Sequence, residues 1–177
     1  GTGRNVTALH RAEMALRESE QRLLRSERKL SQIVDGSSIA TFVIDAGHRV
    51  THWNKACAQL TGHAADEMLG KTGAWRAFYD RQRPTMADLV LSAPDDRMLE
   101  QHYAWFSRSA MIAGAIDAEG HFPGTANGGR GRWLYFTAAP LIGDDGTLIG
   151  AIETIQDISD RKRAQNLLEQ QTAALQQ

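Results

Sequence analysis

The chain has 177 residues, which is enough for one domain of ordinary size and an additional segment. Its 20 basic and 21 acidic residues nearly cancel, which argues against a nucleic-acid-binding protein, because such proteins carry a basic patch or stripe. The single cysteine, Cys57, excludes an intramolecular disulfide and fits a reducing compartment, so we expect a cytoplasmic location. No apolar run approaches the roughly 18 residues of a membrane-spanning helix. Because Gly1 stands where an initiator methionine would be, we expect a fragment of a longer protein.

Residues 1–34 are expected to form a linker helix, since the stretch from Val6 to Val34 contains no glycine or proline. Its strongest apolar positions recur every seven residues, with companions three residues further on that are mostly small. The predicted dimer interface on this stripe consists of Leu9, Leu16, Leu23, Leu30 and Ile33. Four such heptads predict a coiled coil with a second copy or with a neighbouring helix. The alternative is a solvated helix that packs on its own domain.

Residues 35–158 alternate between strand and helix signals. Apolar or β-branched runs bounded by turn residues predict strands over 39–44, 49–53, 110–122, 132–141 and 147–157. Helices are predicted over 55–60, 65–69, 85–91 and, after Pro94, over 95–108. A last helix is expected within 159–177, capped by Ser159. This order predicts an α+β domain with one five-stranded antiparallel sheet and helices at both ends.

Two neighbouring strands contain the candidate polar groups of a pocket. Side chains alternate along a strand, so Trp133 and Tyr135 share one face, and Leu134 and Phe136 share the other. One of these two pairs should line the interior. Glu153 lies in an apolar run and therefore needs a partner, for which Arg132 on the adjacent strand is a candidate. Glu153 is a polar anchor for a small ligand, or else part of a structural ion pair or a solvent-facing residue.

No motif predicts catalysis, so we expect no enzymatic activity in this chain. Asp117, Glu119 and His121 share one strand face, but their spacing is too wide for one ion, and no metal site is predicted. The glycine-rich loop over 124–132 lacks the lysine and the following helix of a phosphate-binding loop.

Several segments resemble a known family. The run from Thr41 to Asp45, the stretch Trp53-Asn54-Lys55-Ala56 and the exit Asp157-Ile158-Ser159-Asp160-Arg161-Lys162 resemble a PAS domain, and the similarity covers roughly residues 35–160. The resemblance implies a five-stranded antiparallel sheet flanked by short helices, with a pocket between them. It also implies a sensory role upstream of a histidine kinase, a diguanylate cyclase or a chemoreceptor, and dimerisation through the flanking helices.

The exit segment is the expected signal junction. A strand that feeds directly into a helix can pass a small change in the sheet to the helix, whereas a flexible linker would absorb it. The junction residues are Asp157, Ser159, Asp160 and Arg161. The alternative is a well-capped terminal helix with no signalling role.

The resemblance also bears on the ligand. In haem-bearing PAS sensors the axial histidine lies on the long helix before the third strand, where His102 and Tyr103 are expected here, so haem is one possible cofactor. Cysteinyl-flavin chemistry is not expected, because Cys57 lacks the required motif and is predicted to be a small buried side chain. The pocket candidates are His102, Tyr103, Trp133, Tyr135, Arg132 and Glu153. The sequence thus predicts a ligand-sensing module, and the alternatives are a haem sensor and a ligand-free dimerisation spacer.

Overall fold

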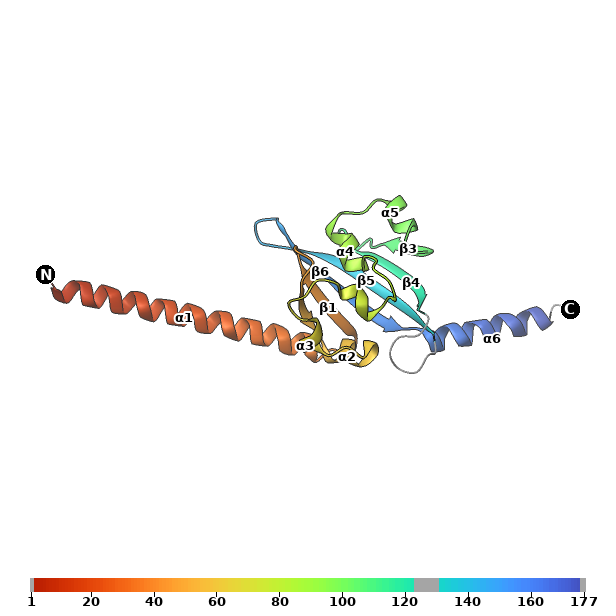
Figure 1. Cartoon of the computed structure of the whole chain (residues 1–177), viewed down its shortest axis with the longest axis horizontal. Helices are drawn as coiled ribbons and strands as arrows, with labels where there is room; N and C mark the ends of the chain where they lie inside the picture. The colour runs from red at the N-terminus through yellow and green to blue at the C-terminus, as the bar shows by residue number, and fades with distance from the viewer. Residues whose placement is uncertain (1, 123–130, 176–177) are drawn as a thin grey trace. The chain divides into compact units, whose positions relative to one another are not determined.

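The computed structural model describes residues 2–122 and 131–175 (Figure 1). Helix α1 (Thr2–Asp35) is continuous and buries none of its side chains. The internal contacts divide the chain into two units, residues 1–36 and residues 37–177. The expected long N-terminal helix is therefore confirmed, and it forms a unit of its own.

The second unit is built on an antiparallel sheet, to which the described residues contribute six strands in the order β2-β1-β6-β5-β4-β3. The strands are β1 (Ala40–Asp45), β2 (Val50–Trp53), β3 (Trp105–Arg108), β4 (Ile116–Phe122), β5 (Arg132–Ile142) and β6 (Leu148–Asp157). β6 lies between β1 and β5, so the strand that leads to the C-terminal helix is central in the sheet. The expected α+β class is confirmed, and the expected number of five strands is wrong.

The additional strand is β3, which lies where a helix over 95–108 was expected. Helix α5 (Asp96–Glu100) ends early, and the chain then turns into β3, whose Trp105 pairs with Glu119 of β4. The aromatic residues Trp105 and Phe106 favour a strand, and pairing with β4 gives their backbone groups partners. β4 accordingly begins at Ile116 and not at residue 110.

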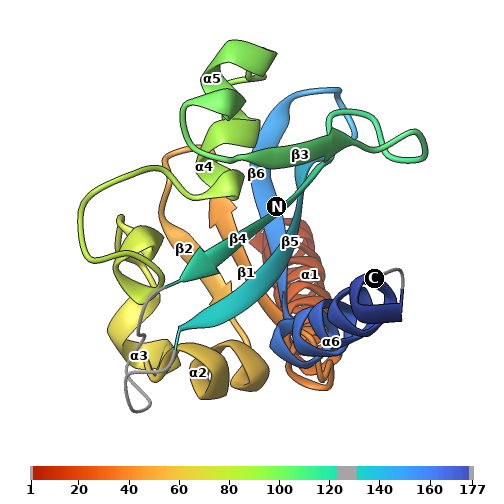
Figure 2. The same ribbon diagram turned by 90° about the vertical axis from the view of Figure 1, so that its right-hand side faces the viewer.

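Short helices cover one side of the sheet (Figure 2). They are α2 (Lys55–Thr61), α3 (Ala65–Met68), the 3₁₀ helix η1 (Ala74–Ala77) and α4 (Met86–Leu91). The core lies between these helices and the sheet, where Phe42, Met86 and Leu134 are almost fully buried. Cys57 on α2 is completely buried in the same core, as predicted, and burial raises the pKa of its thiol.

The last helix, α6 (Ser159–Leu175), follows β6 after a single intervening residue, Ile158. No α6 residue is buried, although its first turns contact β5. Among the helices that the structure describes, none is both long and apolar enough to cross a membrane.

Asn54 ties the sheet to the first short helix. Its Oδ1 accepts hydrogen bonds from the backbone N–H of Thr41 (2.9 Å) and of Cys57 (2.8 Å). Its Nδ2 donates to the carbonyl of Ile39 (2.9 Å). One buried side chain therefore caps α2 and also completes the start of β1.

Replacing Asn54 should cost more than the loss of an ordinary helix cap. Asn54→Ala leaves the buried backbone N–H groups of Thr41 and Cys57 without partners and removes one of the bonds to the carbonyl of Ile39, so we expect a loss of roughly 3 kcal/mol in the free energy of unfolding. Asp95→Ala is the matched control, because Asp95 makes the same cap bond to Met98 at an exposed helix start. Chemical denaturation measures both, and equal losses would contradict the role of Asn54.

Candidate functional site

A cavity of about 580 Å³ opens beside the end of β4. β3 pairs with β4 only as far as Glu119, whereas β4 continues to Phe122. The cavity wall combines the chain around η1 (residues 76–81 and Arg83), the turn at 102–105, the end of β4 at 119–122, and Trp133 of β5. Its volume lies within the range of about 300–1,000 Å³ that is typical of small-molecule sites.

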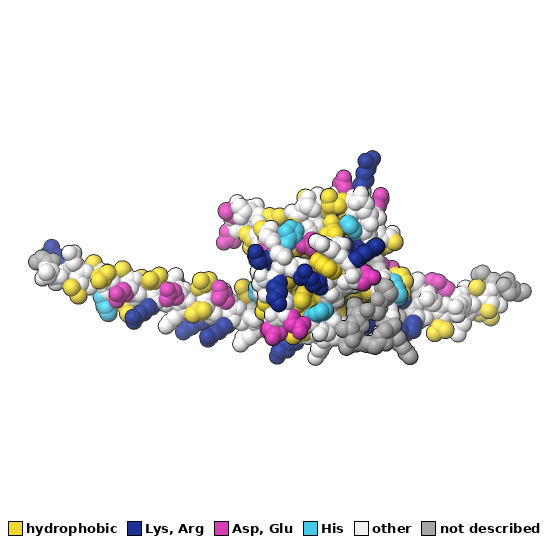
Figure 3. Space-filling view, viewed as in Figure 1, with side chains coloured by type: hydrophobic (Ala, Val, Ile, Leu, Met, Phe, Trp, Pro, Cys, Tyr) yellow, Lys and Arg dark blue, Asp and Glu magenta, His cyan; other side chains and the backbone are white. Residues whose placement is uncertain are grey.

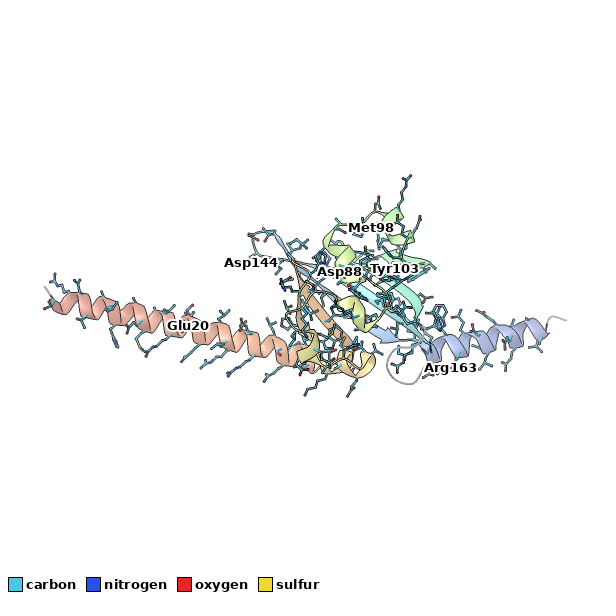
Figure 4. The ribbon with its side chains drawn as sticks, viewed as in Figure 1. Glu20, Asp88, Met98, Tyr103, Asp144 and Arg163 are labelled. Carbon is cyan, nitrogen blue, oxygen red and sulfur yellow. The ribbon has the colours of Figure 1, made fainter. Side chains whose placement is uncertain are left out.

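Aromatic rings form the inner part of this wall. The rings of Tyr79 and Phe122 lie 5.3 Å apart, and Tyr103 packs on Phe136 of β5 at 5.6 Å. The hydroxyl oxygens of Tyr79 and Tyr103 are 3.3 Å apart, within hydrogen-bonding distance. Burial raises the pKa of Tyr79 to about 12 and the pKa of Tyr103 well above its usual value, so both hydroxyls keep their protons. Figure 4 labels Tyr103, which lies within the body of the domain.

Arg83 stacks on both tyrosines. Its guanidinium lies 4.1 Å from the centre of the Tyr79 ring and 5.2 Å from that of Tyr103. Nη2 donates a hydrogen bond to the carbonyl of His102 at 2.9 Å. Nε is buried without a hydrogen-bond partner among the described residues. The cavity thus has a cation in its wall that is held mainly by aromatic faces.

Basic groups outnumber acidic ones around the cavity. Its lining includes Arg76, Arg81, Arg83, His63, His102 and His121, against Asp80 and Glu119. On the face drawn in Figure 3, Lys and Arg side chains and His side chains gather around hydrophobic ones over the middle of the molecule. Burial, and then the charge of Arg83, lowers the pKa of His102, so His102 favours its neutral form.

Three of the predicted pocket residues line this cavity and three do not. His102, Tyr103 and Trp133 belong to its wall. His102 lies in the turn after α5 and not on a long helix, because α5 ends at Glu100. Tyr135 lies on the opposite face of the sheet from the core, where its ring faces Trp105 at 6.4 Å. The pair that faces the interior is Leu134 and Phe136, which are both buried.

Glu153 and Arg132 do not pair with each other. Glu153 faces the core, where its Oε2 accepts a hydrogen bond from the backbone N–H of Ala87 at 2.7 Å. Arg132 is six residues before Ala138, the residue that pairs with Glu153, and its Nε lies 3.8 Å from Asp157 instead. The proposed ion pair is therefore wrong, because the register of β5 and β6 separates the two side chains. Neither residue lines the cavity.

The junction between β6 and α6 is anchored to Trp133. The backbone N–H of Ile158 donates to the carbonyl of Trp133 (2.8 Å), and the N–H of Trp133 donates to Oγ of Ser159 (3.0 Å). Asp157 Oδ1 accepts from the N–H of Ser159 at 2.9 Å. Ser159 therefore does not cap the helix as expected: it is the first helical residue, and its hydroxyl binds the neighbouring strand.

The basic residues after the junction have different environments. Lys162 forms an ion pair with Glu119 of β4, and its Nζ lies 4.9 Å from the centre of the Trp133 ring. Arg161 is exposed, and Arg163 pairs only with the exposed Asp160. Lys162 is thus the side chain that joins α6 to two residues of the cavity wall.

The three alternating residues of β4 that were considered as metal ligands have separate partners. Asp117 accepts a hydrogen bond from Thr137 at 2.7 Å, Glu119 binds Lys162, and the ring of His121 packs on Trp133. Within residues 2–122 and 131–175, no group of three His, Cys, Asp or Glu side chains is placed to hold a metal ion. The predicted glycine-rich loop falls almost entirely on 123–130, outside the described residues.

The site fits haem poorly. A haem pocket places its axial histidine against an apolar cavity. Here His102 follows a five-residue helix, and the cavity wall contains three arginines.

Sequence reasoning missed Arg83, Glu119 and Lys162 as parts of the site. A signal was available for Arg83, because residues 73–84 combine aromatic and basic side chains without helical or strand periodicity. Glu119 was considered only as a metal ligand, and its contact with Lys162 depends on two segments that lie 43 positions apart.

The buried carboxyl of Glu153 should make stability depend on pH. Burial raises its pKa to about 8 from the ordinary value of 4.5. Between these values the folded state binds a proton that the unfolded state has lost, so the stability contribution of Glu153 is present below about pH 4.5 and is lost as pH rises to about 8. We expect Glu153→Gln, which keeps an oxygen for the Ala87 N–H, to remove this dependence.

The measurement is the free energy of unfolding of both proteins from pH 5 to pH 9. The difference between variant and wild type should grow by up to about 1.4 kcal/mol per pH unit and level off above roughly pH 8. Glu100→Gln, at an exposed position on α5, is the control and should follow the wild type. Parallel curves for Glu153→Gln and wild type would refute the assignment.

Similar solved structures share this architecture. An RNA-binding light-oxygen-voltage receptor is 21% identical with a TM-score of 0.54, and the similarity covers 85% of this chain but only 37% of that one. The PAS domain of Bordetella pertussis BvgS is 19% identical with a TM-score of 0.49, covering 84% of this chain and 98% of that one. The PAS domain of an HTR-like protein from Haloarcula marismortui is 17% identical with a TM-score of 0.48, covering 80% and 99%. At these identities the similarity concerns the fold alone.

A family model agrees with this similarity. No curated protein matches the chain. The model described as the PAS fold matches residues 34–163, from the end of α1 to the first turns of α6. Because this match spans well over half of the sequence, the chain belongs to the PAS-fold family.

Proposed function

We propose that this chain is a sensory module in which a small ligand in the cavity beside β4 changes the position of α6. The output domain lies outside this chain and is a histidine kinase, a diguanylate cyclase or a chemoreceptor signalling region. The module itself carries out no catalysis, and it works in the cytoplasm, where the single cysteine stays reduced. Residues 1–34 and 159–177 serve as the connecting helices on either side of the sensor domain.

The contact of Lys162 with the cavity wall is the observation that carries this proposal. Glu119 and Trp133 both line the cavity, and both contact Lys162 on the first turns of α6. The side chains of Lys162 and Glu119 are only about one fifth exposed, so their attraction is less screened than that of a surface pair. A ligand that shifts the end of β4 or the indole of Trp133 therefore acts on α6 directly.

The short connection between β6 and α6 supports the same mechanism. Ile158 and Ser159 both bond to the backbone of Trp133, so the helix start is held on β5 as well as on β6. Small displacements of packed elements pass along such rigid connections, whereas a flexible linker would absorb them. Asp157, Ser159, Asp160 and Arg161 therefore belong to the segment that carries the signal, although Lys162 makes the contact with the wall.

The connecting helices support a homodimer. The five predicted interface residues of α1, which are four leucines and Ile33, are all more than half exposed within the chain. A 34-residue helix with an unburied apolar stripe at heptad spacing gains stability by pairing with a second copy. On α6, Leu167 and Leu168 are also exposed, at 59% and 64%. We infer that paired helices receive and pass on the signal.

A dimerisation spacer without a ligand is the main alternative. It would use the same helices and the same junction but would leave the cavity empty. The volume of the cavity and its stacked, incompletely bonded arginine favour a ligand-binding module, because a spacer needs neither feature. Native mass spectrometry of freshly purified protein distinguishes the two, since a sensor module can retain a small molecule.

Filling the cavity by mutation tests the relay without knowledge of the ligand. A Cβ added at Gly120 would meet Phe122 and Phe136 at ordinary contact distances of 3.5 and 3.9 Å. Gly120→Ala should therefore be tolerated, whereas Gly120→Leu should extend into the cavity that Gly120 lines. We expect Gly120→Leu to change amide hydrogen exchange of Ser159–Arg163 by roughly three-fold or more, and Gly120→Ala to leave it unchanged.

The same measurement on Lys162→Met shows whether the coupling passes through this residue. Breaking its contact with Glu119 and Trp133 should speed exchange in the first turns of α6 by about five-fold. In the Gly120→Leu/Lys162→Met double variant, the effect of the leucine should disappear. Arg163→Met is the control, because it removes only an exposed pair on the same helix. An α6 that responds to Gly120→Leu equally well without Lys162 would rule out this route.

Shortening the α1 stripe should separate the dimer. Leu16→Ala/Leu23→Ala removes two apolar layers, and we expect sedimentation equilibrium to report a monomer where the wild type is a dimer. Met14→Ala/Leu24→Ala removes equally exposed side chains of α1 outside the heptad stripe and should leave the dimer intact. If both double variants sediment with the same mass, pairing through this stripe is excluded.

A further inference from the structure

We propose that the cavity beside β4 binds a small aromatic carboxylate, with the carboxylate on Arg83 and the ring against the aromatic wall formed by Tyr79, Tyr103 and Phe122. This inference rests on the proposed function in one respect, namely that the cavity takes a ligand. It adds the chemical class of that ligand and the side chain that recognises its charge.

Arg83 is the only arginine in the cavity wall that combines partial burial with an unpaired polar atom among the described residues. Two other arginines of the domain have carboxylate partners: Arg108 binds Asp96 at 2.8 Å, and Arg132 lies 3.8 Å from Asp157. Within the described chain Arg83 has no acidic partner, and its one hydrogen bond goes to a backbone carbonyl. A partly desolvated charge gains most from a counter-ion, and a planar carboxylate can accept two parallel N–H bonds from a guanidinium.

The surrounding charges select the sign of the ligand. Arg76 and Arg81 line the same cavity, so three arginines belong to its wall. Of the two carboxylates in the wall, Glu119 is already paired with Lys162, and Asp80 is exposed. A cavity with this balance has a positive potential, which raises the local concentration of anions and disfavours cations.

The aromatic wall selects the shape of the ligand. Tyr79 and Phe122 lie 5.3 Å apart, and Tyr103 continues the same surface towards Phe136. Rings of this kind pack against flat apolar groups, which an inorganic anion lacks. The tyrosine hydroxyls remain protonated, so they can donate hydrogen bonds to an anion. The volume of about 580 Å³ also exceeds the needs of a single inorganic anion.

Binding of three simple probes tests the proposal on the whole chain. The probes are benzoate, its neutral counterpart benzamide, and inorganic phosphate, each followed by isothermal titration calorimetry and by amide NMR shifts at Tyr79 and Phe122. We expect saturable benzoate binding at this site, with benzamide and phosphate weaker by about ten-fold or more. Addition of salt should weaken benzoate binding more than benzamide binding.

Variants identify the residue that recognises the charge. Arg83→Gln should weaken benzoate binding by about ten-fold or more and leave benzamide binding nearly unchanged. Arg83→Lys keeps the charge but loses the planar pair of donors, and we expect it to lie between wild type and Arg83→Gln. Arg97→Gln is the matched control, because Arg97 is exposed on α5 outside the cavity wall. If Arg83→Gln does not fold, as judged by its thermal melting curve, Arg83→Lys carries the comparison.

The outcomes separate this inference from the proposed function. Equal affinity for benzoate and benzamide, or equal benzoate affinity of wild type and both Arg83 variants, would overturn the role of charge and leave a ligand-sensing cavity in place. Tighter binding of phosphate than of benzoate would overturn the aromatic part. Absence of saturable binding by all three probes would overturn the inference as a whole, while the hydrogen-exchange response of α6 to Gly120→Leu would still decide the relay independently.

Discussion

The direct connection from β6 to α6, with no loop between them, is the constraint on which the other features of this PAS domain depend. A central strand of the sheet ends at Asp157, and the helix starts at Ser159. Both Ile158 and Ser159 are bonded to the backbone of Trp133, so α6 cannot change direction without breaking bonds to β5. Lys162 adds a contact with Glu119 and with the Trp133 ring. The helix is thereby held by the same residues that line the cavity.

The buried acid of the core, Glu153, lies apart from the proposed ligand site. Glu153 lies in the core, where the Ala87 N–H and a raised pKa reduce the cost of burying a carboxyl. Arg83 lies in the wall of the cavity beside β4, where aromatic faces and one carbonyl only partly replace its hydration. The first group is satisfied within the fold. The second can still gain a partner, and this difference is the reason why we propose a ligand site at the edge of β4 and not in the centre of the sheet.

The sequence allowed much of the fold and little of the site to be predicted. Long periodic or β-branched segments, such as α1, β1 and β6, were recognisable because a single local pattern determines each of them. The stretch from Asp95 to Arg108 was assigned to one helix, since its strand half becomes stable only by pairing with β4. The expected pairing of Arg132 with Glu153 was wrong. Strand register depends on the turn and on neighbouring strands, so it could not be read from the two strands alone. The contact between Glu119 and Lys162 joins distant segments and had no local signal.

The coupling between cavity and helix is tested most directly by one NMR titration, in which the amide signals of Phe122 and Lys162 are followed together as benzoate is added. If the cavity wall and α6 move as one mechanical unit, both signals should shift along a common binding curve in the wild type. In Lys162→Met the Phe122 signal should still titrate, and the helix signals from residue 159 to residue 163 should stay in place. A wild-type spectrum in which Phe122 saturates while every α6 amide remains fixed would contradict the coupling.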